Sequence, residues 1–211
     1  MDTERLIRTL GKDTAAATPL RATLLRGLLA AAALAGIVFF AALGPRADLA
    51  AALETARFLF KFVVTLALAI AAYGAITVLS RPGAALAHRL LLLLAPVVLL
   101  ALALVAEAVS VPEAEWASRA LGTNSLLCLT FIPLIGIAPL AVLLHALRAG
   151  APTRPVLTGA VAGLLAGGVA ATFYAIHCFD DSPFFVAVWY SLAVAILALA
   201  GAVAGRVVLR W

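Results

Sequence analysis

The residues of this chain with the greatest capacity for chemistry are its two cysteines, Cys128 and Cys178. The chain has no CxxC motif and none of the cysteine and histidine spacings that mark a structural zinc site. Three interpretations stay open. The two sulfurs could form a redox pair, they could bind a thiophilic metal together with His177, Asp180 and Asp181, or they could be inert apolar side chains in a packed interior.

The composition predicts that these cysteines are part of a membrane protein. Of 211 residues, 65% are apolar and 12% are charged, whereas about half of the residues of a globular domain are apolar. A membrane-spanning helix needs roughly 20 mostly apolar residues. Six apolar runs come near that length: 24–43, 58–79, 90–109, 126–147, 156–176 and 184–205. We therefore predict an all-α bundle of six transmembrane helices in residues 24–211, with no soluble catalytic domain and no enzymatic activity.

The distribution of basic residues predicts how this bundle is oriented. Of the 15 Lys and Arg residues, 11 lie on one side of the six-span arrangement, and the other side has only Arg46, Arg57, Lys61 and Arg119. Since Lys and Arg are enriched on the cytoplasmic side of membrane proteins, we predict a multi-pass protein of the bacterial inner membrane with both termini in the cytoplasm. Membrane orientation thus accounts for the net charge of +5, and we expect no direct contact with nucleic acid.

This topology places both cysteines on the outer, oxidising side. Cys128 lies just inside the outer end of the fourth span, and Cys178 lies just beyond the outer end of the fifth. Their midpoint, residue 153, falls in the short turn that joins the two spans, so an antiparallel hairpin brings both thiols to one depth. The spacing does not reveal how each helix is rotated about its axis.

Two charged residues near the outer ends of the second and third spans form another candidate contact. Lys61 and Glu107 are equidistant from residue 84, in the turn between these spans. An antiparallel hairpin would place them level. They are expected either to form an ion pair or to extend separately to the interface, because an isolated charge in hydrocarbon is costly.

Glycines at four-residue spacing predict a close helix–helix contact. Gly159, Gly163 and Gly167 recur along the fifth span, and Gly201 and Gly205 repeat the spacing in the last span. Small residues at this spacing let the backbones of neighbouring helices approach closely in a membrane.

Residues 1–23 are predicted to be a cytoplasmic tail with a short amphipathic helix. The residues of its candidate docking face are Arg5, Leu6, Ile7, Arg8 and Leu10. A helix of about a dozen residues is unstable alone in water. The segment is therefore expected to order only on the anionic inner leaflet or in the groove of a protein partner.

Three segments carry a resemblance to a known family: Glu4–Leu10 in the tail, Asn124–Cys128, and His177–Pro183 running on to Trp189 and Tyr190. In these the chain resembles the NrsF-like negative regulators of sigma-F-type extracytoplasmic-function (ECF) sigma factors, which are six-span anti-sigma proteins. The resemblance implies that the tail holds an ECF sigma factor inactive. It also implies that Cys128 and Cys178 are needed for the response to heavy-metal or oxidative stress.

The resulting hypothesis is that oxidation or metal binding at the two cysteines changes the packing of the fourth and fifth spans and so alters the affinity of the tail for the sigma factor. Apart from a transient thiophilic metal ion at the cysteine pair, we expect no cofactor. A small transporter or channel is the first alternative, but it would normally carry ionisable residues near the bilayer midplane. A membrane thiol oxidoreductase is the second, and it would be expected to have a CxxC motif or a second cysteine pair.

Overall fold

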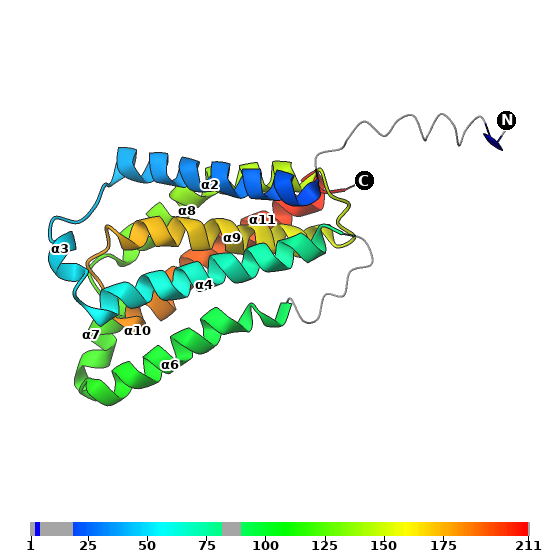
Figure 1. Cartoon of the computed structure of the whole chain (residues 1–211). Coiled ribbons are helices and arrows are strands. Elements are labelled where there is room, and N and C mark those ends of the chain that lie inside the picture. Colours follow the sequence, from blue (N-terminus) through cyan, green and yellow to red (C-terminus); the bar gives the residue numbers. More distant parts are fainter. Residues whose placement is uncertain (1–2, 5–18, 82–89, 211) are drawn as a thin grey trace.

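The computed structural model describes residues 3–4, 19–81 and 90–210, and within these ranges the fold is helical and contains no strand. Six helices run along a common axis (Figure 1). Their bounds are α2 (Leu20–Ala42), α4 (Ala56–Leu79), α6 (Leu94–Ser110), α8 (Ser125–Leu147), α9 (Pro155–Ala175) and α11 (Ser191–Val208). The shorter elements are α3 (Leu49–Ala52), η1 (Glu113–Glu115), α7 (Trp116–Leu121), α10 (Pro183–Phe185) and the π-helical turn η2 (Val186–Tyr190). The all-α prediction is confirmed for the described residues.

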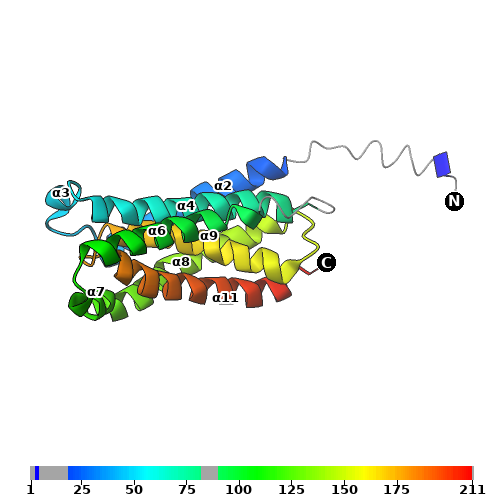
Figure 2. The same cartoon turned by 90° about the horizontal axis from the view of Figure 1, so that it is seen from below.

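The two ends of the bundle differ in what they contain. One end, which we call the cysteine end, gathers the segments 43–55, 111–124 and 176–182 with the short elements α3, α7 and α10 (Figure 1). The other end, which we call the terminal end, has the start of α2, the end of α11 and the turn between α8 and α9 (Figure 2). Cys178 and the charged residues of these connections therefore lie at the end of the bundle opposite the start of α2 and the end of α11.

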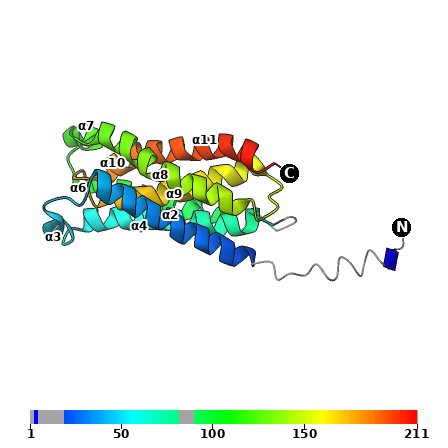
Figure 3. The same cartoon turned by 90° about the horizontal axis from the view of Figure 1, so that it is seen from above.

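Helix α9 lies at the centre of the bundle. It packs against α11, α4 and α8, and α2 packs against α8 and, less extensively, against α9 (Figure 3). Helix α6 is peripheral: it packs against α4 and α10, and only Pro96 and Glu107 of its residues are buried. The core thus belongs to five long helices, with α6 attached at the side.

The predicted spans agree with the observed helices to within about four residues at each end, and the largest differences are at the starts of the first and third. Five helices are long and apolar enough to cross a membrane: α2, α4, α8, α9 and the continuous helix Pro183–Val208. Helix α6 has 17 residues, which rise about 25 Å, and it begins at Leu94 rather than at residue 90. Pro96 has no N–H and its ring would clash with the carbonyl of Leu92 in a continuous helix, so the chain before it forms shorter turn bonds such as Leu93 N to Leu90 O (3.0 Å).

The glycine spacing does mark the closest helix contact in the described fold. A Cβ on Gly159 would meet the carbonyl oxygen of Gly201, and one on Gly163 would meet that of Leu197. The backbones of α9 and α11 are therefore in direct contact, as expected for small residues in membrane helices.

Replacing Gly163 with alanine should weaken this contact. We expect Gly163→Ala to lower the free energy of unfolding by about 1–3 kcal/mol, the usual cost of overpacking, because the added methyl meets backbone that cannot rotate away. Unfolding of the detergent-solubilised protein measures the change. Gly74→Ala is the matched control, since a Cβ there meets nothing within 4 Å, and an equal loss in both variants would contradict the packing argument.

Candidate functional site

The two cysteines lie at the cysteine end, and both are fully buried with free thiols. Cys128 is in the first turn of α8, where its backbone N–H donates to the carbonyl of Asn124 (2.8 Å). Cys178 follows α9, and its N–H donates to the carbonyl of Tyr174 (3.1 Å). Both side chains belong to the same buried core. The structure therefore places in one core the two cysteines that the hairpin spacing placed at one depth.

Two tyrosines surround this thiol pair. Tyr174, in the last turns of α9, is fully buried, and Tyr190, at the end of η2, is 3% exposed. Their rings are 5.8 Å apart between centroids, and both pack in the same buried core as Cys128 and Cys178. Among the described residues, their hydroxyls are the buried side-chain oxygen or nitrogen atoms that have no oxygen or nitrogen partner for a hydrogen bond. The nearby sulfur of Cys178 is the group that both hydroxyls can hydrogen-bond, and a thiol is a weak partner.

Residues 176–182 form the loop that carries Cys178, which we call the cysteine loop. Two cations from other segments hold it. Lys61 Nζ donates to the carbonyl oxygen of Cys178 (2.8 Å) and pairs with Asp181 Oδ1 (2.5 Å). Arg46 Nη1 contacts the same carbonyl (3.2 Å) and Asp181 Oδ2 (3.1 Å). The guanidinium also pairs with Asp48 (2.6 Å) and lies over the ring of Phe179. One peptide carbonyl and one carboxylate thus join α4, the segment after α2 and the cysteine loop.

Asp180 connects this loop to the start of α8. Its carboxylate accepts hydrogen bonds from the backbone N–H groups of Thr123 (3.0 Å) and Asn124 (2.8 Å), next to the positive end of the helix dipole. The preceding Gly122 has a φ of +58°, and a Cβ there would meet Asp180 and Phe185. Only glycine fits this turn without strain. The residue two positions after Cys178 therefore anchors the helix that carries Cys128.

A second ion-pair group lies beside the first, and it corrects the expected partner of Lys61. Glu107, which is 4% exposed, pairs with Arg57 (2.9 Å) and Arg119 (3.4 Å) and accepts a hydrogen bond from Ser182. Lys61 pairs with Asp181 instead. The equal spacing from residue 84 placed Lys61 and Glu107 at one depth, but Lys61 faces the cysteine loop. An open pocket of about 810 Å³ is bordered by the charged residues Arg57, Glu107, Arg119, Asp180 and Asp181.

The predicted metal-ligand residues do not converge in the structure. His177 Nδ1 lies 3.0 Å from the carbonyl oxygen of Gly44, which can only accept, so this nitrogen carries the proton. Asp180 and Asp181 bind α8 and the two cations. The described residues hold no group of three or more His, Cys, Asp and Glu that could bind a metal ion. Metal binding at Cys128 and Cys178 stays a prediction.

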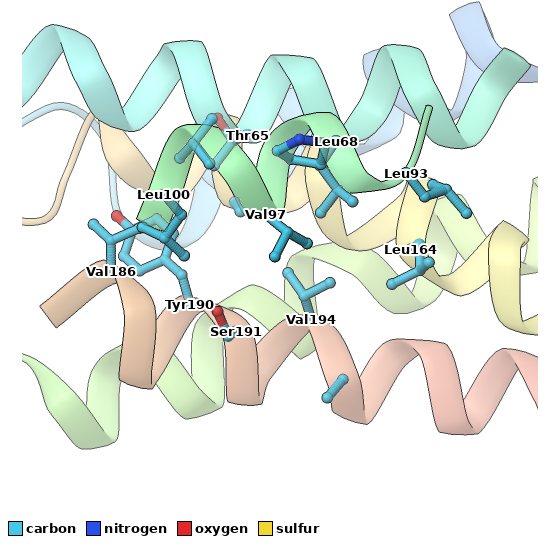
Figure 4. A pocket seen from close by; sticks show the side chains of 14 residues that line it. Thr65, Leu68, Leu93, Val97, Leu100, Leu164, Val186, Tyr190, Ser191 and Val194 are labelled. Carbon is cyan, nitrogen blue, oxygen red and sulfur yellow. The ribbon is translucent and has the colours of Figure 1, made fainter. Parts of the chain in front are cut away.

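An apolar cavity of about 260 Å³ lies between α4, α6, α9 and the helix that begins at α10 (Figure 4). Its polar lining side chains are those of Thr65, Tyr190 and Ser191. Tyr190 therefore forms part of the cavity wall, and it also contacts the thiol cluster electrostatically. The π-helical turn that carries it is a feature often found at functional sites.

Burial controls the reactivity of Cys178. Its thiol lies in the loop between α9 and α10, and desolvation raises its pKa, while the nearby charge of Lys61 acts in the opposite direction. The thiolate is the reactive form of cysteine, so this side chain is both covered and held in its unreactive state. In contrast, hydrogen bonding from Arg46 lowers the pKa of the exposed Asp48 carboxyl.

A scan of family models adds an independent observation, because the family "Negative regulator of sigma F" (NrsF) matches residues 10–211. The chain belongs to the NrsF family. It is 38% identical over 216 residues to the anti-sigma-F factor NrsF of Caulobacter vibrioides (strain NA1000 / CB15N), with all of both chains covered. It is 36% identical over 184 residues to the probable anti-sigma-F factor NrsF of Azospira oryzae (strain ATCC BAA-33 / DSM 13638 / PS), covering 85% of this chain and 84% of the relative. No solved structure matches. The resemblance to NrsF proteins is confirmed.

Sequence reasoning missed several residues of this NrsF site. Arg46, Tyr174 and the anchoring role of Asp180 were not expected. A signal was available for the role of Asp181, because Lys61 interrupts an apolar run and a buried positive charge needs an anionic partner; no such signal pointed to Arg46. The tail residues Arg5, Leu6, Ile7, Arg8 and Leu10 lie outside the described residues, so their predicted docking role stays a prediction.

The raised pKa of Cys178 predicts slow alkylation of the native protein. In a Cys128→Ser variant, maleimide labelling of Cys178 should need a higher pH in the folded than in the denatured protein, because burial disfavours the thiolate. Mass spectrometry of timed samples from pH 6 to 10 measures the two profiles. Superimposable profiles would contradict the buried environment.

Proposed function

We propose that this protein is an integral inner-membrane anti-sigma factor that binds an ECF sigma factor through its N-terminal cytoplasmic tail. It releases the sigma factor when Cys128 and Cys178, on the outer side, respond to heavy-metal or oxidative stress. The observation that carries this proposal is membership of the NrsF family over residues 10–211, together with a full-length relative named as an anti-sigma-F factor.

Helix length and charge support the six-span topology. Beside the five helices that meet the length for a span, α6 is apolar and its 17 residues lie at the lower limit for crossing a bilayer. Among the described residues, the cysteine end has four basic residues, Arg46, Arg57, Lys61 and Arg119, and the terminal end has seven: Arg21, Arg26, Arg81, Arg148, Arg154, Arg206 and Arg210. The positive-inside rule assigns the end with more Lys and Arg to the cytoplasm.

The thiol cluster supports a sensing role. Oxidation by a hydroperoxide would join the two sulfurs, release the alcohol and water, and transfer two electrons from the thiols to the peroxide. Binding of a thiophilic ion would instead release the thiol protons. The buried hydroxyls of Tyr174 and Tyr190, which lie beside Cys178 and have no oxygen or nitrogen partner, supply donors that stabilise a thiolate in either route. Both routes require the covered Cys178 to become accessible.

The connections of the cysteine loop supply a route from the thiols to the helices. Asp180 holds the start of α8, and Asp181 holds Lys61 of α4. A change in the loop therefore bears on two helices that run to the terminal end. Coupling across the membrane requires an element with two arrangements that differ in affinity both for the stimulus at the cysteines and for the sigma factor at the tail. We assign that role to this loop together with α8 and α4.

The tail can be tested by removing residues 2–18, which leaves Pro19 and the whole of α2 intact. Full-length protein purified from its native cells should capture a sigma factor, and the shortened form should not, because the docking face is lost. Mass spectrometry of co-purified proteins measures this. Leu6→Asp with Leu10→Asp should have the same effect in a tail of natural length. A folded full-length protein without a tail-dependent partner would instead favour the transporter alternative.

The cysteines can be tested in the same assay. Cells carrying Cys128→Ser with Cys178→Ser should keep the sigma factor bound after cadmium or peroxide treatment, whereas cells with the natural protein should release it. The fraction of sigma factor in the membrane pellet gives the readout. Release from the double variant would mean that the stimulus acts elsewhere. Ser118→Ala, at an exposed hydroxyl near the same end, is the control for a nonspecific effect.

A further inference from the structure

Lys61 carries a charge at a position where charge is unusual. It is the sixth residue of α4, a helix apolar enough to span a membrane, and its side chain is 0% exposed. Ionisable residues within membrane helices are expensive and commonly functional. A buried ion pair with Asp181 does not explain the residue through stability, because replacing such pairs by apolar side chains is often neutral or stabilising.

The atom that Lys61 contacts suggests its role. Both Lys61 Nζ and Arg46 Nη1 donate to the carbonyl oxygen of Cys178 (2.8 and 3.2 Å). On the other side of the same residue, the N–H of Cys178 is bonded to Tyr174. Both peptide groups that flank Cys178 are therefore fixed, one by α9 and the other by the two cations. This arrangement fixes the backbone on both sides of Cys178, and its buried thiol donates weakly to the carbonyl oxygen of Asp180 in the same loop (3.7 Å).

We propose that Lys61 and Arg46 are positioning residues of the cysteine sensor: by holding the Cys178 carbonyl and Asp181, they keep the thiol covered, and release of this hold exposes Cys178 to its stimulus. The inference rests on the proposed sensing function and adds the step that controls it. Asp181 is essential to the arrangement, because its carboxylate pairs with both cations and keeps them beside the carbonyl, while Asp48 supplies Arg46 with a second negative partner.

The direction of the effect separates this role from simple electrostatics. The positive charge of Lys61 favours the thiolate of Cys178, so its removal from an otherwise unchanged site should raise the pKa further and slow alkylation. If Lys61 instead holds the loop closed, its removal exposes Cys178, moves the pKa towards its ordinary value and accelerates alkylation. The two explanations predict changes of opposite sign.

The test measures maleimide labelling of Cys178 in native membranes, in the Cys128→Ser background. Lys61→Met should label at least about tenfold faster at pH 7, the change in thiolate fraction that one pKa unit produces. Arg57→Met is the matched control, because Arg57 is one turn away on α4 and pairs with Glu107 rather than with the cysteine loop. Unchanged or slower labelling of Lys61→Met would overturn the proposal.

A second variant separates positioning from loss of folding. Lys61→Met with Asp181→Asn removes both charges of the pair, so neither is left buried without its partner, but the carbonyl still loses its lysine donor. Fast labelling with an unchanged melting temperature supports the proposal. Labelling that returns to the natural rate when stability is restored would show that Lys61 acts only through stability.

The labelling experiment needs no sigma factor, so its result is independent of the proposed function. Fast labelling of Lys61→Met without any tail-dependent partner would overturn the anti-sigma proposal and retain the positioning role. Slow labelling of Lys61→Met in a protein that does capture a sigma factor would overturn the positioning role and retain the anti-sigma proposal. If both hold, Lys61→Met should also release the sigma factor without stress.

Discussion

The arrangement of the cysteine end depends on two buried cations that share one carboxylate and one peptide carbonyl. Lys61 and Arg46 each contact Asp181 and the carbonyl of Cys178. In a low-dielectric interior an unpaired charge is far more costly than a paired one, so these contacts are made together. They join helix α4, the segment after α2 and the loop after α9, which are distant in the sequence.

The helices around these two cations differ in how tightly they are packed: α9 and α11 are in close contact, whereas α6 is peripheral. Glycines bring α9 and α11 into backbone contact, which leaves little freedom for these two helices to move against each other. At the start of helix α8, the carboxylate of Asp180 accepts a hydrogen bond from the N–H of the capping residue Asn124. The helix then continues through Pro133 and Pro139. Helix α6 is held mainly by α4, α10 and the ion pairs of Glu107.

The two covered thiols are unreactive in the packed structure. Burial disfavours the thiolate of Cys178, and only the thiolate attacks an oxidant or binds a soft metal. Two buried tyrosine hydroxyls beside the thiols have no oxygen or nitrogen partner for a hydrogen bond, so the sulfur of Cys178 is the group available to them. In this arrangement Cys178 is enclosed, and its neutral thiol form is favoured.

The sequence by itself determined the helix positions, the glycine contact and the shared depth of the two cysteines. Each depends on local properties: the length of an apolar run, a four-residue spacing, and equal counts from a turn. It did not determine the partner of Lys61, the role of Asp180 or the tyrosines around the thiols. Spacing along a helix gives depth in the bundle, but the neighbour that a side chain meets depends on the rotation of each helix and the path of each loop. Those are decided only when all the helices pack together, because buried charges and close backbone contacts must be satisfied at the same time.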